Sequence, residues 1–172
     1  SGSFSSDYVI SNMDIFHTYK KLLPNEILPI NRLKQERSSS AVIFYWGIKQ
    51  SFPDLDLHNI FFSKNYKKEF QAIFKDKTVS EDPTIYINVT SKEVVGDAPK
   101  GCENWFVMIN TPADHGQDWT QIVNRLRSHI ISNISKRLNV DLKNLIECEQ
   151  VLTPHDIESK TQSYMGALYG AS

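Results

Sequence analysis

Residues 41–48 read Ala-Val-Ile-Phe-Tyr-Trp-Gly-Ile, the longest uninterrupted apolar run in the chain. Successive side chains of a β-strand point to opposite faces of a sheet, so a strand with one solvated face alternates apolar and polar residues. This run is apolar at both odd and even positions, which is typical of a strand covered on both faces. We therefore expect residues 38–48 to form a central strand.

Two further strands are predicted at residues 84–90 and 104–110, joined by a connection that contains Gly and Pro, and they are expected to pair antiparallel. One face of this pair is uniformly aliphatic or indole: Ile85, Ile87 and Val89, with Trp105, Val107 and Ile109. The other face mixes aromatic, thioether and amide groups, which is unusual for a solvated face. It indicates a cavity wall or an interdomain surface, and ordinary packing under a covering helix is the alternative.

Helical periodicity is strongest over residues 118–138. Its apolar stripe consists of Trp119, Ile122, Val123, Leu126, Ile130, Ile134 and Leu138. A shorter helix is predicted after a brief strand at residues 58–62, and its stripe consists of Tyr66, Phe70, Ile73 and Phe74. We expect the long helix to dock on the sheet.

The two ends of the chain predict further elements. Residues 8–10 have the β-branched character of a short strand, and Ser11 or Asn12 is expected to cap a helix carrying Met13, Phe16, Tyr19 and Leu23. Toward the other end we predict a helical turn at 142–146, a strand at 147–152, and a helix opened by Thr153 and Pro154. The predicted fold class is α+β, with a mixed, largely antiparallel sheet packed with helices.

Composition excludes several function classes. Among the 172 residues, 40% are hydrophobic and 23% charged, which fits one ordinary domain, and the formal charge of −1 argues against nucleic acid as a partner. No apolar run approaches the ~18 residues of a membrane span. Cys102 and Cys148 lie far apart without a CxxC motif, and the histidines lack ligand spacing, so we expect no metal site.

No catalytic motif stands out in the chain. It contains no GxGxxG, GxxxxGK[ST] or GxSxG sequence, so we expect no phosphate-binding loop in it. Asp114 and His115 are interpreted as part of a solvated loop, because no nucleophile accompanies them. His17 and His58 are interpreted as structural histidines. The catalytic residues are therefore unknown from spacing alone.

Ordered motifs nevertheless resemble those of bacterial carotenoid (phytoene) desaturases over nearly the whole chain. They include YVISNMD at 8–14, SSS at 38–40, WGI at 46–48, HNIFF at 58–62, Tyr66, DPTIY at 82–86, APKGCE at 98–103, DW at 118–119, TP at 153–154 and GALYG at 166–170. The family is similar in plan to amine oxidases, in which a substrate domain is inserted into an FAD domain. This chain resembles the substrate side.

The resemblance implies a division of the protein into parts. Residues 1–3, Ser-Gly-Ser, look like a cloning scar, and residues 4–172 are expected to be a substrate-binding segment of a longer flavoprotein. FAD is implied for the full-length enzyme, but the glycine-rich flavin segments of the family are missing here. We therefore expect no FAD on this segment, and we expect the segment alone to be inactive.

The implied reaction is dehydrogenation of a long polyene, such as phytoene or a hydroxycarotenoid, in which a hydride passes to the flavin. The protein must then mainly orient a hydrocarbon and exclude water. The implied partners are this polyene, the FAD domain of the same parent chain and a peripheral contact with a membrane. The implied location is the cytoplasm, at the inner membrane face.

Strand geometry selects the residues expected to line the substrate. They are Phe44, Trp46, Tyr86, Asn88, Phe106 and Met108. In the first strand Ile43 and Tyr45 would serve nearly as well, because both parities are apolar. Alternatives for the function are a retinol saturase-like or amine oxidase-like flavoprotein segment, or a non-catalytic module that binds a lipid or a protein partner.

Overall fold

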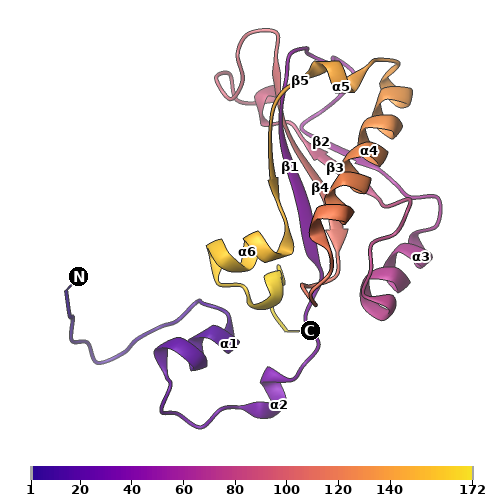
Figure 1. Cartoon of the computed structure of the whole chain (residues 1–172). Coiled ribbons are helices and arrows are strands. Elements are labelled where there is room, and N and C mark those ends of the chain that lie inside the picture. Colours follow the sequence, from indigo (N-terminus) through magenta and orange to yellow (C-terminus); the bar gives the residue numbers. More distant parts are fainter. Residues whose placement is uncertain (1, 172) are drawn as a thin grey trace.

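A computed structural model describes residues 2–171 and places one antiparallel sheet at the centre of the molecule (Figure 1). The strands are β1 (Ser40–Ile48), β2 (His58–Phe61), β3 (Ile85–Asn88), β4 (Glu103–Thr111) and β5 (Ile146–Leu152). Their order across the sheet is β2-β3-β4-β1-β5, and every neighbouring pair is antiparallel. The predicted α+β class is confirmed, as is the antiparallel pairing of β3 with β4.

α-Helices accompany this sheet. They are α1 (Ile15–His17), α2 (Ile30–Leu33), α3 (Tyr66–Gln71), α4 (Trp119–Leu138), α5 (Leu142–Leu145) and α6 (Pro154–Thr161). Two of them continue as π-helical segments, α1 into Thr18–Leu22 and α3 into Ala72–Asp76, and short 3-10 turns occupy Thr90–Lys92 and Tyr164–Gly166. The predicted helix starts at Asp118 and Thr153 are confirmed, because both side chains accept hydrogen bonds from first-turn amides.

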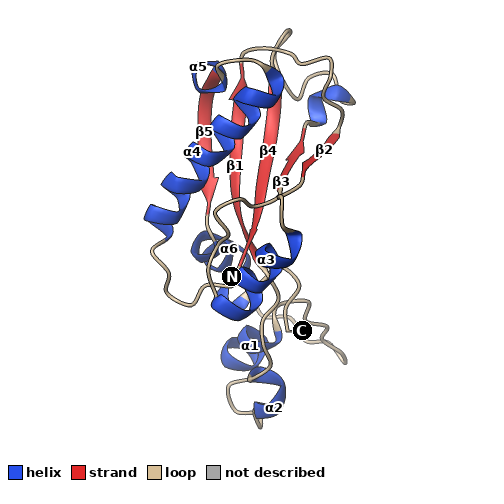
Figure 2. Cartoon of the chain, turned by 90° about the vertical axis from the view of Figure 1, so that its right-hand side faces the viewer, coloured by secondary structure: helices blue, strands red, loops and turns tan. Residues whose placement is uncertain are grey.

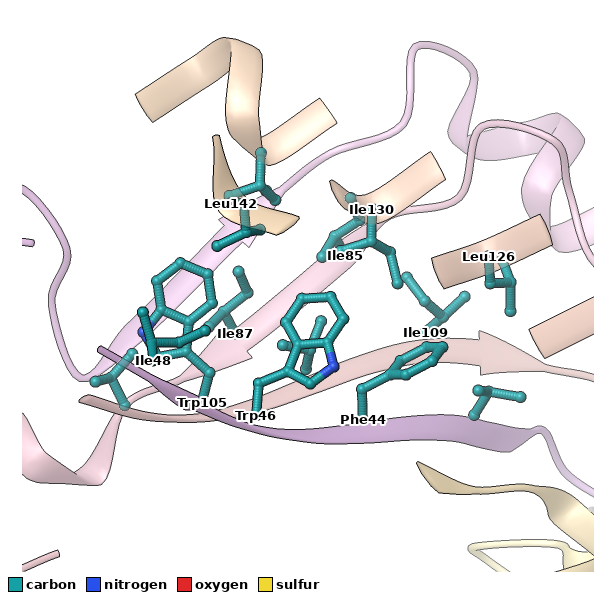
Figure 3. Close-up of a cluster of buried hydrophobic side chains, with 14 of the residues drawn as sticks. Phe44, Trp46, Ile48, Ile85, Ile87, Trp105, Ile109, Leu126, Ile130 and Leu142 are labelled. Carbon is teal, nitrogen blue, oxygen red and sulfur yellow. The ribbon is translucent and has the colours of Figure 1, made fainter. Parts of the chain in front are cut away.

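One side of the sheet, the covered face, lies beneath α4, which crosses the strands diagonally (Figure 2). Its sheet residues are Val42, Phe44, Trp46, Ile48, Ile85, Ile87, Trp105, Val107 and Ile109, all at most 1% exposed. Leu126 and Ile130 of α4 point toward them (Figure 3). The predicted stripe of the long helix therefore docks on the sheet, and burial of these apolar groups is the main stabilising contribution.

The other side of the sheet, the open face, is covered only at one end. Its residues on the three middle strands are Ala41, Ile43, Tyr45, Gly47, Tyr86, Asn88, Asn104, Phe106 and Met108. Ile157 of α6 packs against Ala41 and Ile43, whereas Tyr45 is 40% exposed. The prediction of a central strand is confirmed for β1, which lies between β4 and β5, but complete coverage of both its faces was wrong.

The first residues of the chain differ from the prediction. Residues 8–10 form no strand: Tyr8, Val9 and Ile10 are 90%, 85% and 94% exposed. A strand needs a neighbour to pair its amides and carbonyls, and none of the described strands lies beside this segment. The helix that follows is present, but Asp14 caps it instead of Ser11 or Asn12, by accepting the amide N–H of Phe16.

Contacts between distant residues tie the N-terminal segment to the C-terminal turn. The rings of Phe16 and Tyr164 stack with centroids 3.6 Å apart, and His17 Nε2 lies 3.1 Å from Glu158 Oε1. Arg37 lies over the Tyr164 ring.

In residues 2–171, no helix is both long and apolar enough to cross a membrane.

Candidate functional site

The six residues predicted to line one surface divide between the two faces. Phe44 and Trp46 lie on the covered face, where they are buried beneath α4, while Tyr86, Asn88, Phe106 and Met108 lie on the open face. Directly opposed residues of antiparallel strands share a face, and Phe106 faces Tyr45, not Phe44. The expectation that Phe44 and Trp46 share one surface with the other four residues was therefore wrong, and the β1 residues that share their face are Ile43 and Tyr45.

Aromatic rings form a row across four strands of the open face. Phe106 is at its centre: its ring makes edge contacts with Tyr45 at 5.5 Å and with Tyr86 at 6.3 Å between centroids. The row ends on β2, where His58 stacks on Tyr86 and its Nδ1 lies 2.8 Å from the tyrosine hydroxyl. The rings of this aromatic row are partly exposed, so their edges and faces are accessible to a ligand on the open face.

A groove of about 970 Å³ adjoins the aromatic row on the end of the open face that α6 leaves free. Tyr45, Gly47, Asn88, Asn104 and Phe106 line its sheet side. Its walls are residues 147–150 of β5 and the loop residues 97–99 with Cys102. Trp46 also borders the groove, although its ring lies on the covered face, whereas Phe44, Tyr86 and Met108 do not line it.

Gly47 allows β5 to contribute a thiol to this groove. A Cβ atom built on Gly47 would lie 2.6 Å from Cys148 Sγ, closer than real side chains approach. The two residues are cross-strand neighbours, so the thiol occupies the space that a side chain on β1 would fill. Because Gly47 has no side chain, the Cys148 thiol can lie at this part of the groove. The WGI motif at residues 46–48 did not indicate this role of Gly47.

Hydrogen bonds hold the loop wall over the end of the sheet. Asn104 Nδ2 donates to Thr90 Oγ1 at 2.7 Å, and Asn104 Oδ1 accepts the amide of Ser91 at 2.9 Å. The Thr90 hydroxyl in turn donates to Asp97. Because one asparagine of β4 uses both ends of its amide here, the wall is fixed to the strand that carries Phe106.

Glu103 stabilises the same end of the sheet through its side-chain carboxylate. Its carboxylate is buried and accepts hydrogen bonds from the Phe52 amide at 2.8 Å, Trp105 Nε1 at 2.8 Å and Ser51 Oγ at 3.0 Å, while Lys92 Nζ lies 2.8 Å away. Burial by itself would raise the pKa of Glu103, but these donors outweigh it and hold the pKa below its ordinary value. The group is therefore a charged structural anchor.

Histidines and acids elsewhere have structural partners. Asp114 accepts Trp119 Nε1 at 3.0 Å and the Gly116 amide at 2.9 Å, so it is more than part of a solvated loop. His17 contacts Glu158, as described above, and its structural interpretation agrees with this contact. Cys102 and Cys148 are free thiols. The described residues hold no cluster of three or more His, Cys, Asp or Glu with metal-binding geometry.

The helix starts of the described segment do not fit the pyrophosphate of a dinucleotide. Such a group binds free amides at a helix N-terminus, usually behind a glycine-rich loop. In α4 and α6, however, Asp118 and Thr153 each accept one first-turn amide, from Gln121 and Asp156, and both Asp118 and Asp156 place a carboxylate at the helix start. The pKa of Asp156 lies below its ordinary value because hydrogen bonds from Thr153 outweigh the effect of its burial.

Comparisons with known proteins identify similar chains. A 1-hydroxycarotenoid 3,4-desaturase from a Flavobacterium species is 60% identical over 171 residues, 99% of this chain. A phytoene desaturase from Fusarium fujikuroi is 32% identical across 97% of the chain, and a 4,4'-diaponeurosporene oxygenase from Staphylococcus aureus is 36% identical across 96%. The chain spans 33–35% of the length of these relatives. No protein-family model matches the sequence.

Proposed function

Because this chain belongs to the carotenoid desaturase family, we propose that it forms the substrate-binding part of an FAD-dependent carotenoid desaturase. The observation that carries the proposal is the aromatic row on a sheet face that is covered only at one end, beside a groove of about 970 Å³. A polyene is a bare hydrocarbon along most of its length and offers no hydrogen-bonding groups there. A surface of aromatic rings can bind such a hydrocarbon, because this binding requires no charged side chain.

We propose that residues of the open face bind the polyene. Tyr86, Asn88, Phe106 and Met108 stay in the proposed lining, and Tyr45 takes the place of Phe44 and Trp46. The apolar part of the substrate lies over Phe106 and Tyr45, while Asn88 and Asn104 border the groove with amides. An oxygenated end group would meet these amides, and the 60% identical relative is a desaturase of hydroxycarotenoids.

Desaturation is the reaction class that we propose for the whole protein. The relative with 60% identity and the fungal relative are desaturases, whereas the staphylococcal relative, at 36% identity, is an oxygenase. Both reactions act on a long polyene, so both require a surface that orients hydrocarbon and excludes water. We propose the open face as this surface for either chemistry, and the 60% identity to a desaturase favours desaturation.

We propose that FAD binds to other parts of the same protein. This assignment is supported by Asp118 and Thr153, each of which already accepts a first-turn amide in the two longest described helices, where a pyrophosphate would have to compete. We infer that residues 4–172 are a substrate-domain segment, that its partner is an FAD domain, and that the segment alone is inactive. We also propose a cytoplasmic location, with a peripheral contact at the inner membrane face.

Polyene binding by the chain tests this proposal. We expect phytoene dispersed in detergent to bind the chain, and Phe106→Ala to weaken that binding roughly tenfold, because a central ring of the row is lost. The measurement is a titration followed by quenching of tryptophan fluorescence. Tyr169→Ala is the matched control, because Tyr169 is an exposed aromatic residue that belongs neither to the groove lining nor to the aromatic row.

Two outcomes would reject the open face as the binding surface. One is equal affinity of the wild type and Phe106→Ala for phytoene. The other is a loss of affinity in Tyr169→Ala that matches the loss in Phe106→Ala, because it would show non-specific adhesion to exposed rings. A stability measurement on each variant separates loss of binding from loss of folding.

A further inference from the structure

Asn88 is a polar side chain between two rings of the aromatic row. In the sheet it is paired with His58 of β2 on one side and with Phe106 of β4 on the other, and both rings belong to the row. Its side chain is half-buried and lines the groove together with Phe106. A ligand that lies on the aromatic row and enters the groove therefore meets the Asn88 amide.

Hydrogen bonds fix the orientation of this amide. Its nitrogen, Nδ2, donates to the backbone carbonyl of Leu57 at 3.1 Å and lies 3.2 Å from His58 Nδ1. A carbonyl oxygen only accepts hydrogen bonds, so the reversed amide would place two acceptors against each other. The oxygen Oδ1 is thus directed away from Leu57, and it accepts no hydrogen bond from any residue between 2 and 171.

The second amide that lines the groove, that of Asn104, is already used at both ends. Its nitrogen donates to Thr90 and its oxygen accepts the Ser91 amide, as described above. Of the two groove amides, Asn88 is therefore the one whose oxygen is left for a ligand. An amide oxygen accepts a hydrogen bond from an O–H group but not from an ether or a hydrocarbon, which carry no such proton.

We propose that Asn88 is a specificity-determining residue, whose Oδ1 accepts a hydrogen bond from a hydroxyl group at the end of the polyene. The inference rests on the proposed function, because it requires the polyene to lie over Phe106 and Tyr45. A hydrocarbon end covers the amide oxygen and removes it from water without replacing the lost hydrogen bond, whereas an alcohol replaces it. Sites built to bind a hydroxyl group discriminate against ligands that lack it for this reason.

Three polyenes with one carbon skeleton test the proposal. They are lycopene, the alcohol formed by adding water across its terminal double bond, and the methyl ether of that alcohol. Each is dispersed in detergent and titrated into the chain, and quenching of tryptophan fluorescence reports binding. The wild type should bind the alcohol roughly fivefold more tightly than the ether or lycopene, as expected for one hydrogen bond between uncharged groups. Equal affinities for the alcohol and the ether would overturn the proposal.

A substitution of the amide shows which residue causes the preference. Asn88→Leu keeps a side chain of similar size but removes the acceptor, so this variant should bind the alcohol and the ether equally. Asn104→Leu is the matched control and should retain the preference, although a disturbed loop wall weakens all three polyenes. The ratio of the two affinities is the readout, because a purely structural effect of Asn88→Leu would weaken both ligands alike.

A wild-type ratio in Asn88→Leu, or loss of the preference in Asn104→Leu, would contradict the role of Asn88. Circular dichroism shows whether each variant folds. The comparison of alcohol with ether on the wild type requires no variant, so it tests the proposal also when Asn88→Leu does not fold.

Failure of this inference and failure of the proposed function give different results. If none of the three polyenes binds the wild type, or if Phe106→Ala binds them all as tightly, the open face is not the polyene surface and both proposals fall. If all three bind and Phe106→Ala weakens them, but the alcohol and the ether bind equally, only the role of Asn88 is rejected.

Discussion

The covered face and the open face belong to the same strands, yet they differ in what lies against them. Alternate residues of β4 show the contrast: Trp105, Val107 and Ile109 are buried, and Phe106 and Met108 between them are only partly buried. Both sets are large and apolar, so composition does not separate them. The difference comes from α4, which docks on one face, while α6 reaches only the end of the other.

This contrast separates stability from binding. Apolar surface that a helix removes from water stabilises the fold, whereas apolar surface left accessible is available to a ligand. Substitutions that remove side-chain volume on the covered face should therefore lower the stability of the fold. Substitutions on the open face should instead weaken ligand binding. The following variants test that division, from the largest expected effect to the smallest.

Phe44→Ala should lower the free energy of unfolding by roughly 3–5 kcal/mol, because the ring is fully buried under α4. Urea denaturation followed by circular dichroism measures the change. The matched exposed variant is Phe62→Ala, which should change the stability by less than about 1 kcal/mol. Comparable losses in the two variants would contradict the assignment of Phe44 to the core.

Leu126→Ala should lower the free energy of unfolding by about 2–5 kcal/mol, since this side chain joins α4 to the covered face. The same denaturation experiment applies, with the exposed Leu22→Ala as its control. A loss below about 0.5 kcal/mol would mean that this side of α4 faces solvent.

Glu103→Gln should lower the free energy of unfolding by roughly 1–3 kcal/mol, because it removes the buried carboxylate that Lys92 contacts. The lowered pKa of Glu103 also predicts a pH dependence in the wild type. Its contribution is complete above the unfolded-state value of about 4.5 and disappears as the pH falls through the lower folded-state value.

Denaturation of both proteins across the acidic range checks the sign of this effect. The stability difference between the wild type and Glu103→Gln should shrink as the pH falls. A difference that stays constant, or grows toward low pH, would mean that Glu103 is not held as a charged group.

Phe106→Ala should have the smallest effect on folding, roughly 1 kcal/mol or less, because its ring is only partly buried. It should weaken phytoene binding, as proposed above. A loss of several kcal/mol with unchanged phytoene affinity would place Phe106 in the core and erase the distinction between the two faces.

Much of the fold could be predicted from local patterns. Strict alternation along β3 and β4 identified the core side of both strands, and periodicity identified the α4 stripe. Thr153, Pro154 and Asp156 identified the start of α6, because capping depends on residues within one turn. Family resemblance over the whole chain was likewise visible in its ordered motifs, and the relatives confirm it.

The candidate site could be predicted only in part. Four of its residues, Tyr86, Asn88, Phe106 and Met108, were assigned to one face correctly, because their strands alternate. Tyr45 and Cys148 were not chosen. Tyr45 belongs to a run that is apolar at both parities, and Cys148 reaches the groove only because Gly47 lies opposite it.

The sequence by itself determined which segments are strands or helices wherever a periodic pattern or a cap was present. Only the tertiary structure decided which side of β1 faces α4, since an all-apolar strand carries no period-two signal and its orientation depends on register with β4 and β5. It also decided that Tyr66 and Phe70 of α3 are exposed while Glu69 between them is buried, where its carboxylate accepts hydrogen bonds from Thr84. Both decisions depend on contacts between residues far apart in the chain, which local patterns do not encode.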